Sequence, residues 1–270
     1  MKRISVTLLC TLLAVASTDP RSRRESSSRT PVVIELFTSE GCSTCPPAEA
    51  LLARLERQPF EGVEIIGFEE HVDYWNRLGW LDPYSDLDWT LRQQDYVLAF
   101  KGQGVYTPQV VVDGHKESIG SRAEEVIDSI REAARNAKSE ITLAALSPMR
   151  KDGVQVKIKI GPLQGATGKD TPEVWLALTE AGLDSSVKAG ENAGKTLRHS
   201  SVLRSLRKVG VADANQEKVS YDSTATAKVR GNWKRTNLRA VVFLQEKKSK
   251  RILGAAAVPV ESTNTDSGSG

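Results

Sequence analysis

The sequence predicts an α/β domain with a mixed sheet, followed by a small β-sandwich-like C-terminal domain, in a chain of 270 residues. Two observations lead to this prediction. Apolar runs alternate with helical periodicities in the first half, whereas the second half consists mainly of short apolar or alternating runs between turns. The net charge changes sign between the same two halves. Residues 30–138 contain 10 basic and 19 acidic side chains, whereas residues 139–260 contain 21 basic and 11 acidic side chains. The net charge of +3 therefore combines an acidic part and a basic part.

The start of the chain predicts export. Residues 1–3 carry two positive charges, and residues 4–16 are almost entirely apolar and end in an A-x-A cleavage pattern. We therefore expect residues 1–16 to be a signal peptide, which removes Cys10 and leaves no transmembrane segment in the mature chain. The mature protein is expected in the bacterial periplasm or outside the cell, where a close cysteine pair can exist as a disulfide.

The predicted boundary between the two domains follows residue 138. Residues 31–138 form the expected α/β domain and residues 139–260 the expected β domain. Residues 17–30 and 261–270 are rich in small polar residues, which predicts a disordered linker and a disordered tail. Because the two domains have opposite net charges, we expect them to dock through apolar surface with charges at its rim, leaving Cys42 open.

Two strands and two helices are expected at the start of the α/β domain. Residues 32–37 and 63–68 are nearly continuous apolar runs, as in parallel strands that are buried on both faces. The apolar residues of segments 48–55 and 85–100 recur at helical spacing, so a helix follows each strand. The first helix begins close to the cysteines, where proline is tolerated in the first turn.

A hairpin and a third helix complete this domain. Residues 110–112 form a third apolar strand, Asp113–Gly114 is a strong turn signal, and residues 116–119 are expected to return as a strand. The pattern of residues 121–124 is a capping box, which predicts that the last helix begins there. The resulting order, β-α-β-α-β-β-α, is that of a thioredoxin-like domain.

Thr107–Pro108 lies immediately before the third strand. In thioredoxin-like folds a cis proline occupies this position beside the cysteine pair and exposes a backbone edge to the partner chain. Proline is the only residue for which a cis bond costs little free energy. We therefore expect a cis bond between Thr107 and Pro108 and include both residues in the candidate site.

The pair Cys42-x-x-Cys45 has three possible roles. As a structural disulfide it closes a loop of only four residues, which contributes about 2 kcal/mol. A structural zinc site needs four ligands, but a copper(I) site made of Cys42, Cys45 and His71 needs fewer. As a reactive dithiol the pair benefits from its place at a helix N-terminus, which stabilises a thiolate. We favour the dithiol, with Cys42 as the exposed attacking sulfur and Cys45 as the buried resolving sulfur.

The end of the second strand carries polar residues toward the cysteines. Because parallel strands end on the same side, Glu69, Glu70 and His71 are expected at this edge of the sheet. His71 titrates near neutral pH and is a candidate to accept or relay a proton during thiol–disulfide exchange. Alternatively, it hydrogen-bonds within the aromatic segment 73–89, which either lines a groove for a peptide or, as we favour, belongs to the core. His115 is expected to be solvated in its turn.

The second half is expected to be a small β domain with one helix. Strands are expected at residues 154–160, 174–178, 240–244 and 252–258, and the apolar spacing of residues 202–209 predicts a helix packed on the sheet. The basic excess could attract anionic envelope components or the acidic domain. The chain contains no nucleic-acid-binding motif, so we expect no nucleic acid partner.

Four segments together resemble a known family: VVIELFTSEGCSTCPP, HVDYWNRLGW, VYTPQVVVDG and GENAGKTLRHSSVLRSL. The sequence is similar over residues 31–258 to the secreted, thioredoxin-like bacterial family catalogued as domain of unknown function 1223. This resemblance implies a thioredoxin-like domain followed by a small β domain, and it implies no substrate. Glu40 stands where we expect glutamine in many members, and its carboxylate opposes a thiolate on Cys42.

We therefore predict an exported thiol–disulfide oxidoreductase without a cofactor. Its expected partners are protein thiols or disulfides and a separate redox partner protein. The predicted site consists of Cys42, Cys45, Thr107, Pro108 and His71. The alternative is a non-catalytic binding module that uses the same dithiol to carry copper(I) or a partner protein.

Overall fold

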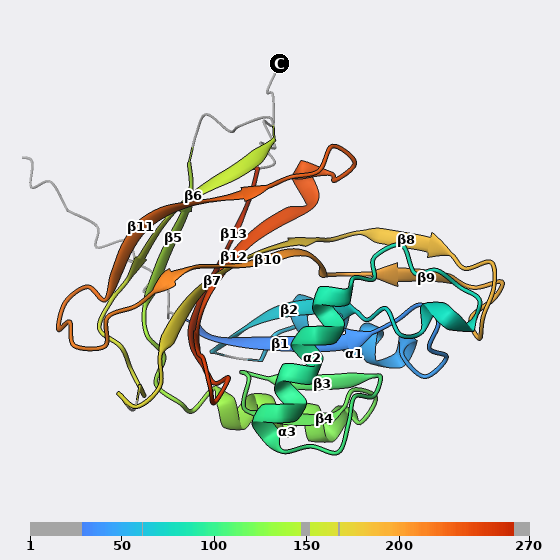
Figure 1. Cartoon of the computed structure of the whole chain (residues 1–270), viewed down its shortest axis with the longest axis horizontal. Coiled ribbons are helices and arrows are strands. Elements are labelled where there is room, and N and C mark those ends of the chain that lie inside the picture. Colours follow the sequence, from blue (N-terminus) through green and yellow to red (C-terminus); the bar gives the residue numbers. More distant parts are fainter. Residues whose placement is uncertain (1–28, 61, 147–151, 167, 262–270) are drawn as a thin grey trace, which may run out of the picture.

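The computed structural model describes residues 29–60, 62–146, 152–166 and 168–261 (Figure 1). The predicted signal peptide and most of the two predicted tails lie outside the described residues. Among the described helices, none combines the length and the apolar character that a membrane crossing requires. The fold is a mixed α/β arrangement with few helices around one large sheet.

The large sheet contains eight strands, in the order β13-β12-β7-β10-β2-β1-β3-β4. Four of them come from the first half of the chain: β1 (Thr30–Thr38), β2 (Val63–His71), β3 (Gln109–Val112) and β4 (Lys116–Ile119). The other four come from the second half: β7 (Pro172–Glu180), β10 (Val202–Val211), β12 (Leu238–Glu246) and β13 (Ile252–Pro259). The two predicted domains are therefore joined through strand pairing.

The junction within the sheet is between β2 and β10. These strands are parallel and pair at Val202 and Glu69. On the other side of β2, β1 runs parallel along its whole length, with Thr38 opposite His71 at the carboxyl end. The ends of β1 and β2 thus lie directly beside the start of β10, which brings the two halves of the chain together at this edge.

Three helices cover the first half of the sheet. The alternation along β1 decides which face each residue meets. Val32, Ile34 and Leu36 pack against α1 (Pro46–Arg57) and α3 (Ala123–Ala133), whereas Phe37 contacts the core beneath α2 (Leu87–Phe100) on the other face. Two short 3₁₀ turns, η1 (Asn76–Leu78) and η2 (Arg235–Asn237), lie in the connections.

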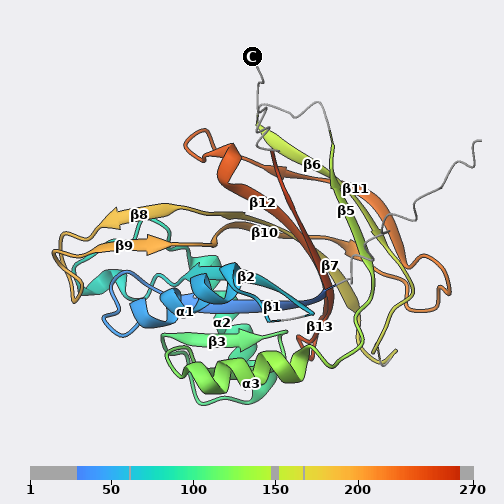
Figure 2. The ribbon, with the colours of Figure 1, turned by 180° about the vertical axis from the view of Figure 1, so that it is seen from behind.

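Two further groups of strands belong to the second half. A three-stranded sheet consists of β5 (Ile141–Ala145), β6 (Gly153–Ile160) and β11 (Tyr221–Lys228), and it covers the outer part of the large sheet through an apolar core (Figure 2). The hairpin of β8 (Leu183–Ser186) and β9 (Thr196–His199) extends from β7 and β10 over the end of the sheet where α1 begins (Figure 1). This hairpin carries the loop that reaches the cysteines.

The strands and helices expected in the first half, and the four strands expected in the second, are present, but two local predictions are wrong. The segment 202–209 is not a helix, since it belongs to β10, which pairs antiparallel with β7. The predicted capping box is also absent, because α3 has Arg122 at its N-cap and no side-chain hydrogen bond caps the helix. Ser121 lies instead in an exposed turn, and Glu124 is the second residue of α3.

The turn between β3 and β4 forms as predicted and touches the second half of the chain. Asp113 and Gly114 have φ angles of 48° and 60°, as the two central residues of this hairpin turn require. A Cβ added at Gly114 would lie 1.9 Å from the backbone oxygen of Lys250 in the β12–β13 turn. Glycine is therefore required both for the backbone conformation and for the close approach of the two turns.

Gly114→Ala is expected to lower the free energy of unfolding by about 2–4 kcal/mol, since left-handed strain adds to a backbone clash. Urea denaturation measures this change. The matched control is Gly62→Ala, because Gly62 has a φ of 74° but no atom within 4 Å of the added Cβ. The control should lose only about 1 kcal/mol. Equal losses in the two variants would show that the contact with Lys250 contributes nothing.

Candidate functional site

The two cysteines form a disulfide in the turn between β1 and α1. Their Cα atoms lie 5.5 Å apart, within the range of unstrained disulfides. Cys45 is the N-cap residue of α1, and Pro46 and Pro47 occupy the first helical positions, where no backbone N–H is needed. The sequence therefore places the pair at a helix N-terminus as predicted, with Cys42 on the turn before it.

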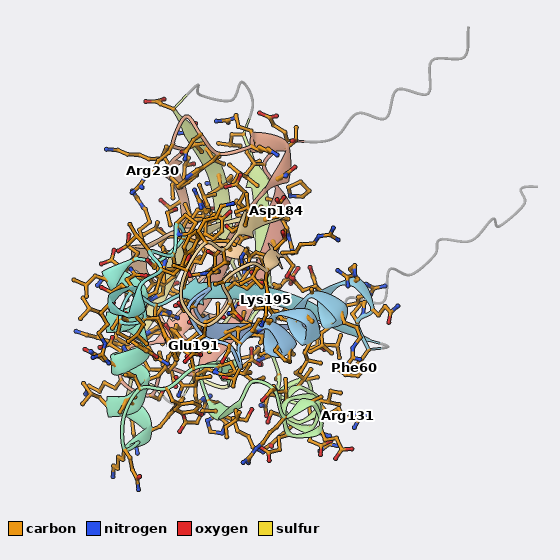
Figure 3. The ribbon with its side chains drawn as sticks, turned by 90° about the vertical axis from the view of Figure 1, so that its right-hand side faces the viewer. Phe60, Arg131, Asp184, Glu191, Lys195 and Arg230 are labelled. Carbon is orange, nitrogen blue, oxygen red and sulfur yellow. A yellow bond between two sulfur atoms is a disulfide. The ribbon has the colours of Figure 1, made fainter. Side chains whose placement is uncertain are left out.

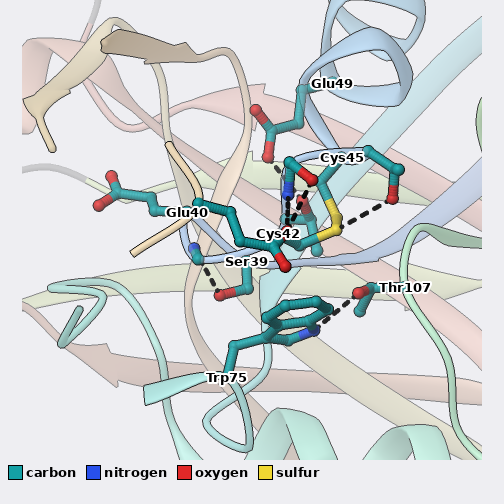
Figure 4. The surroundings of a disulfide bond; sticks show 12 residues. Ser39, Glu40, Cys42, Cys45, Glu49, Trp75 and Thr107 are labelled. Atoms are coloured by element: carbon teal, nitrogen blue, oxygen red, sulfur yellow. Dashed lines mark hydrogen bonds between the residues drawn. A yellow bond between two sulfur atoms is a disulfide. The ribbon is translucent and has the colours of Figure 1, made fainter. Parts of the chain in front are cut away.

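The aromatic segment supplies one wall of this site. Figure 4 shows Trp75 and Thr107 beside the disulfide, joined by a hydrogen bond of 2.8 Å from Nε1 to Oγ1. Gly41 approaches Trp75 so closely that an added Cβ would lie 3.2 Å from the Cβ of Trp75. The Thr107–Pro108 bond is cis, as predicted. The hydroxyl of Thr44 lies 3.4 Å from Sγ of Cys42 and can donate a hydrogen bond to a thiolate there.

The loop between β8 and β9 packs against the turn that carries the cysteines. Nδ2 of Asn192 donates to the backbone oxygens of Glu40 and Cys42, both at 2.9 Å. The carboxylate of Glu191 accepts two hydrogen bonds from Ser43, at 3.0 Å from its N–H and at 2.6 Å from its hydroxyl. Figure 3 shows Glu191 and Lys195 of this loop next to the region of α1.

Both cysteines are 0% exposed, so the expectation of an open, exposed Cys42 is wrong. The second half of the chain docks onto the first, but over the cysteine turn rather than away from it. Net charge alone could not have located this contact, because it is made by individual hydrogen bonds from Asn192 and to Glu191.

Asn192→Ala is expected to speed reduction of the disulfide by a small phosphine. The substitution removes two hydrogen bonds, which together stabilise the closed loop by about 1–3 kcal/mol, so the rate should rise about 5- to 150-fold. The measurement is the appearance of free thiols over time at phosphine concentrations where the rate is proportional to phosphine. Lys188→Ala, at an exposed position of the same loop, is the control and should leave the rate unchanged. An unchanged rate for Asn192→Ala would mean that the loop does not limit access.

His71 is buried at the carboxyl end of β2, as its position in the strand predicts. Its Nδ1 lies 2.8 Å from Oδ2 of Asp82, and its ring meets those of Tyr84 and His199. Burial lowers the pKa of His71, but the charge and hydrogen bond of Asp82 outweigh burial, so the pKa is raised. Among the described residues, its hydrogen-bond and ring partners do not include either cysteine. The proton relay therefore remains a prediction.

The carboxylate of Glu40 has partners of its own. Oε2 accepts a hydrogen bond from Nε1 of Trp80 at 2.7 Å, and Oε1 lies 3.1 Å from Nε2 of His199. Burial lowers the pKa of His199, but the nearby carboxylates of Glu40 and Glu69 raise it to about 11. The negative charge of Glu40 is thus balanced by a histidine rather than directed only at the cysteines.

Several residues of this region were missed by reasoning from the sequence. Asn192 and His199 lie within the fourth of the quoted family segments, which is the signal that could have found them. Asp82 lies in the aromatic segment and accepts a hydrogen bond from the backbone N–H of Glu40. The segment belongs partly to the core, through Trp89, and partly to the surroundings of the cysteines, through Trp75. His115 is exposed, as predicted.

Two solved structures share the fold. A crystal structure of a protein from Agrobacterium tumefaciens aligns with a TM-score of 0.63 at 24% identity, covering 87% of this chain and 96% of the other. HBP35 of Porphyromonas gingivalis aligns with a TM-score of 0.62 at 13% identity, covering 88% of this chain and 78% of the other. No curated protein matches the sequence.

A family model also matches the sequence, over residues 33–245, and this range contains both cysteines, the loop of Asn192 and His199. Its description is that of a protein of unknown function, DUF1223. The match covers most of the chain and confirms the family resemblance drawn from the four segments. The chain belongs to the DUF1223 family.

Proposed function

We propose that this protein is an exported thiol–disulfide oxidoreductase whose reactive group is the pair Cys42 and Cys45. The supporting observation is that the two residues form a disulfide at the N-terminus of α1, directly after a central parallel strand. This pair belongs to a β-α-β-α-β-β-α segment that we interpret as a thioredoxin-like domain, followed by a β-sandwich-like domain. Thr107 and Pro108 provide the backbone edge for the partner chain.

The proposed exchange proceeds in two displacements. In the reduced protein the Cys42 thiolate attacks one sulfur of a substrate disulfide, which forms a mixed disulfide and releases one substrate thiolate. The Cys45 thiolate then attacks Sγ of Cys42, which releases the second substrate thiol and forms the Cys42–Cys45 disulfide. Each released thiolate takes up a proton, and a separate redox partner protein with a dithiol returns the two electrons.

The covering loop has a place in this proposal. A disulfide that is 0% exposed cannot be attacked until Asn192 and Glu191 release the cysteine turn. Because only a few hydrogen bonds hold the loop there, it can open on binding a partner whose backbone replaces those bonds. The loop would then slow exchange with small thiols without preventing it, while admitting a matching protein readily.

Catalytic turnover of a model disulfide tests the proposal. The mature protein is mixed in substoichiometric amount with a fluorogenic peptide disulfide and dithiothreitol, and product formation is followed over many equivalents. Multiple turnovers per protein, absent in a Cys42→Ser variant, support an oxidoreductase. A single equivalent of product, or none, contradicts it and favours the binding module; copper(I) bound by the reduced protein through both cysteines would identify a metal carrier.

Export is part of the proposal and has a separate test. Expression of the full chain in a Gram-negative host, followed by mass spectrometry of the periplasmic fraction, should give a mature protein that begins at Ser17. A protein that stays in the cytoplasm with residues 1–16 attached would contradict export and would place the cysteines in a reducing compartment.

A further inference from the structure

A cluster of two histidines and a glutamate is buried where the two halves of the chain meet. Glu69 and His71 are two positions apart on β2, so both face α1, and His199 reaches them from the end of β9. One ligand atom from each residue lies within 4.8 Å of the others. The side chains of all three residues are fully buried.

One side-chain atom of each of these three residues is buried without a hydrogen bond to any described residue. Within the described part of the chain, Nε2 of His71, Nδ1 of His199 and Oε2 of Glu69 are buried and have no hydrogen-bond partner. Nδ1 of His199 lies 3.5 Å from Oε2 of Glu69. A buried polar atom without a partner costs about 1–3 kcal/mol, so three such atoms in one place call for an explanation.

Each histidine is also held by a carboxylate on its other ring nitrogen. Asp82 holds Nδ1 of His71 at 2.8 Å, and Glu40 holds Nε2 of His199 at 3.1 Å. Histidines that bind metal ions are oriented in this way, because the carboxylate fixes the ring and raises the basicity of the free nitrogen. The nitrogens left over, Nε2 of His71 and Nδ1 of His199, are the two without a hydrogen-bond partner among the described residues.

Glu49 of α1 provides a fourth candidate ligand atom, a carboxylate oxygen. The hydroxyl of Thr38 donates to its Oε1 at 2.5 Å, which leaves Oε2 3.8 Å from Nδ1 of His199. Two imidazole nitrogens and two carboxylate oxygens form a common ligand set for Zn²⁺, and two carboxylates balance the charge of a divalent ion. Bonds of about 2.0–2.1 Å place tetrahedral ligands about 3.4 Å apart. The separations among the ligand atoms of Glu69, His71 and His199 therefore need to shorten by only about 1.4 Å at most.

We propose that Glu69, His71 and His199 bind a divalent transition-metal ion, of which Zn²⁺ fits best, with Glu49 as the fourth ligand. A cleft of about 660 Å³ next to α1 is lined by His199, Ser200 and Arg239 and gives an ion a route to the cluster. This proposal does not depend on the thiol chemistry, since neither cysteine is a ligand.

Zinc titration of the oxidised, chelator-treated mature protein is the first test. Calorimetry should show one Zn²⁺ per chain for the wild type and at least about 100-fold weaker binding for Glu69→Gln and His199→Gln. Asp82→Asn, which alters only the orienting carboxylate, should weaken binding about 10- to 100-fold. His115→Gln removes an exposed histidine and is the matched control, which should bind as the wild type does. Equal binding by all variants would reveal an adventitious ion and overturn the proposal.

X-ray absorption of the wild-type zinc complex tests the site without any variant that could fail to fold. The expected spectrum has nitrogen and oxygen neighbours at about 2.0–2.1 Å, with the outer-shell scattering of two imidazoles. Sulfur neighbours at about 2.3 Å would place the ion on the cysteines instead and overturn the assignment. Because the protein is oxidised in both experiments, a failure of the oxidoreductase proposal leaves these results interpretable.

Discussion

Cys42→Ser is expected to reduce catalytic turnover of the model disulfide to the uncatalysed rate, because serine provides no thiolate to attack sulfur at neutral pH. Cys45→Ser should behave differently. It retains the attacking thiolate but lacks the resolving one, so a mixed disulfide between Cys42 and the substrate should accumulate. Non-reducing gel electrophoresis followed by mass mapping distinguishes the two variants.

The assignment of roles follows from the local structure. Cys45 caps α1 and is held by the helix, whereas Cys42 lies on the turn before it with the hydroxyl of Thr44 beside its sulfur. Trapping through Cys45 in the Cys42→Ser variant would reverse the roles. Loss of folding is not expected to obscure the result, because a disulfide that closes a four-residue loop contributes only about 2 kcal/mol.

The part of the site that could be predicted from the sequence is the part built by residues that are close to one another along the chain. The apolar run of β1, the turn and the periodicity of α1 place Cys42 and Cys45 at the helix N-terminus without any long-range information. The register of parallel strands likewise carries His71 to the end of β2. These features depend on side-chain alternation and turn residues, which a sequence records directly.

The loop that carries Asn192, and the position of His199, could not be predicted from such local patterns. Asn192 contacts an oxygen 150 positions away, and His199 contacts Glu40 at a separation of 159. Such contacts depend on the pairing of β10 with β2, which rests on the single pair of Val202 and Glu69. No periodicity in either segment indicates that they meet.

The wrong helix at residues 202–209 has an identifiable physical cause. Pairing between β10 and β7 is irregular between Leu203 and Ser205 and again between Lys208 and Gly210. Each irregularity shifts the alternation of buried and exposed residues by one position. Apolar residues then recur at intervals of three, which imitates a helix although the backbone is extended.

Arg92→Met is expected to lower the free energy of unfolding by about 3–5 kcal/mol, the usual cost of leaving a buried charge without its partner. Arg92 projects from α2, its side chain is 10% exposed, and its Nε donates to Oε2 of the fully buried Glu35 at 2.5 Å. Its guanidinium also lies 5.9 Å from the Trp175 ring and 5.6 Å from the Phe243 ring. The side chain therefore connects the first half of the chain with β7 and β12.

In the Arg92→Met variant, the carboxylate of Glu35 would lose the positive charge that Arg92 provides. Tyr96 donates its hydroxyl hydrogen to Glu35, and burial raises the pKa of Tyr96 well above its ordinary value, so the phenol remains neutral. Burial, followed by the charge of Glu35, also raises the pKa of Glu70 well above its ordinary value. Arg92 is consequently the cation that balances Glu35.

Urea denaturation at pH 7 of two further variants separates this charge effect from loss of packing. Arg131→Ala breaks an ion pair with Asp128 in which both side chains are more than half exposed, and it should cost less than about 1 kcal/mol. The double variant Arg92→Met/Glu35→Gln removes both charges and should recover part of the loss, because no ionised group remains buried alone. A double variant as unstable as Arg92→Met would mean that the guanidinium stabilises the fold through its contacts with Trp175 and Phe243 rather than through its charge.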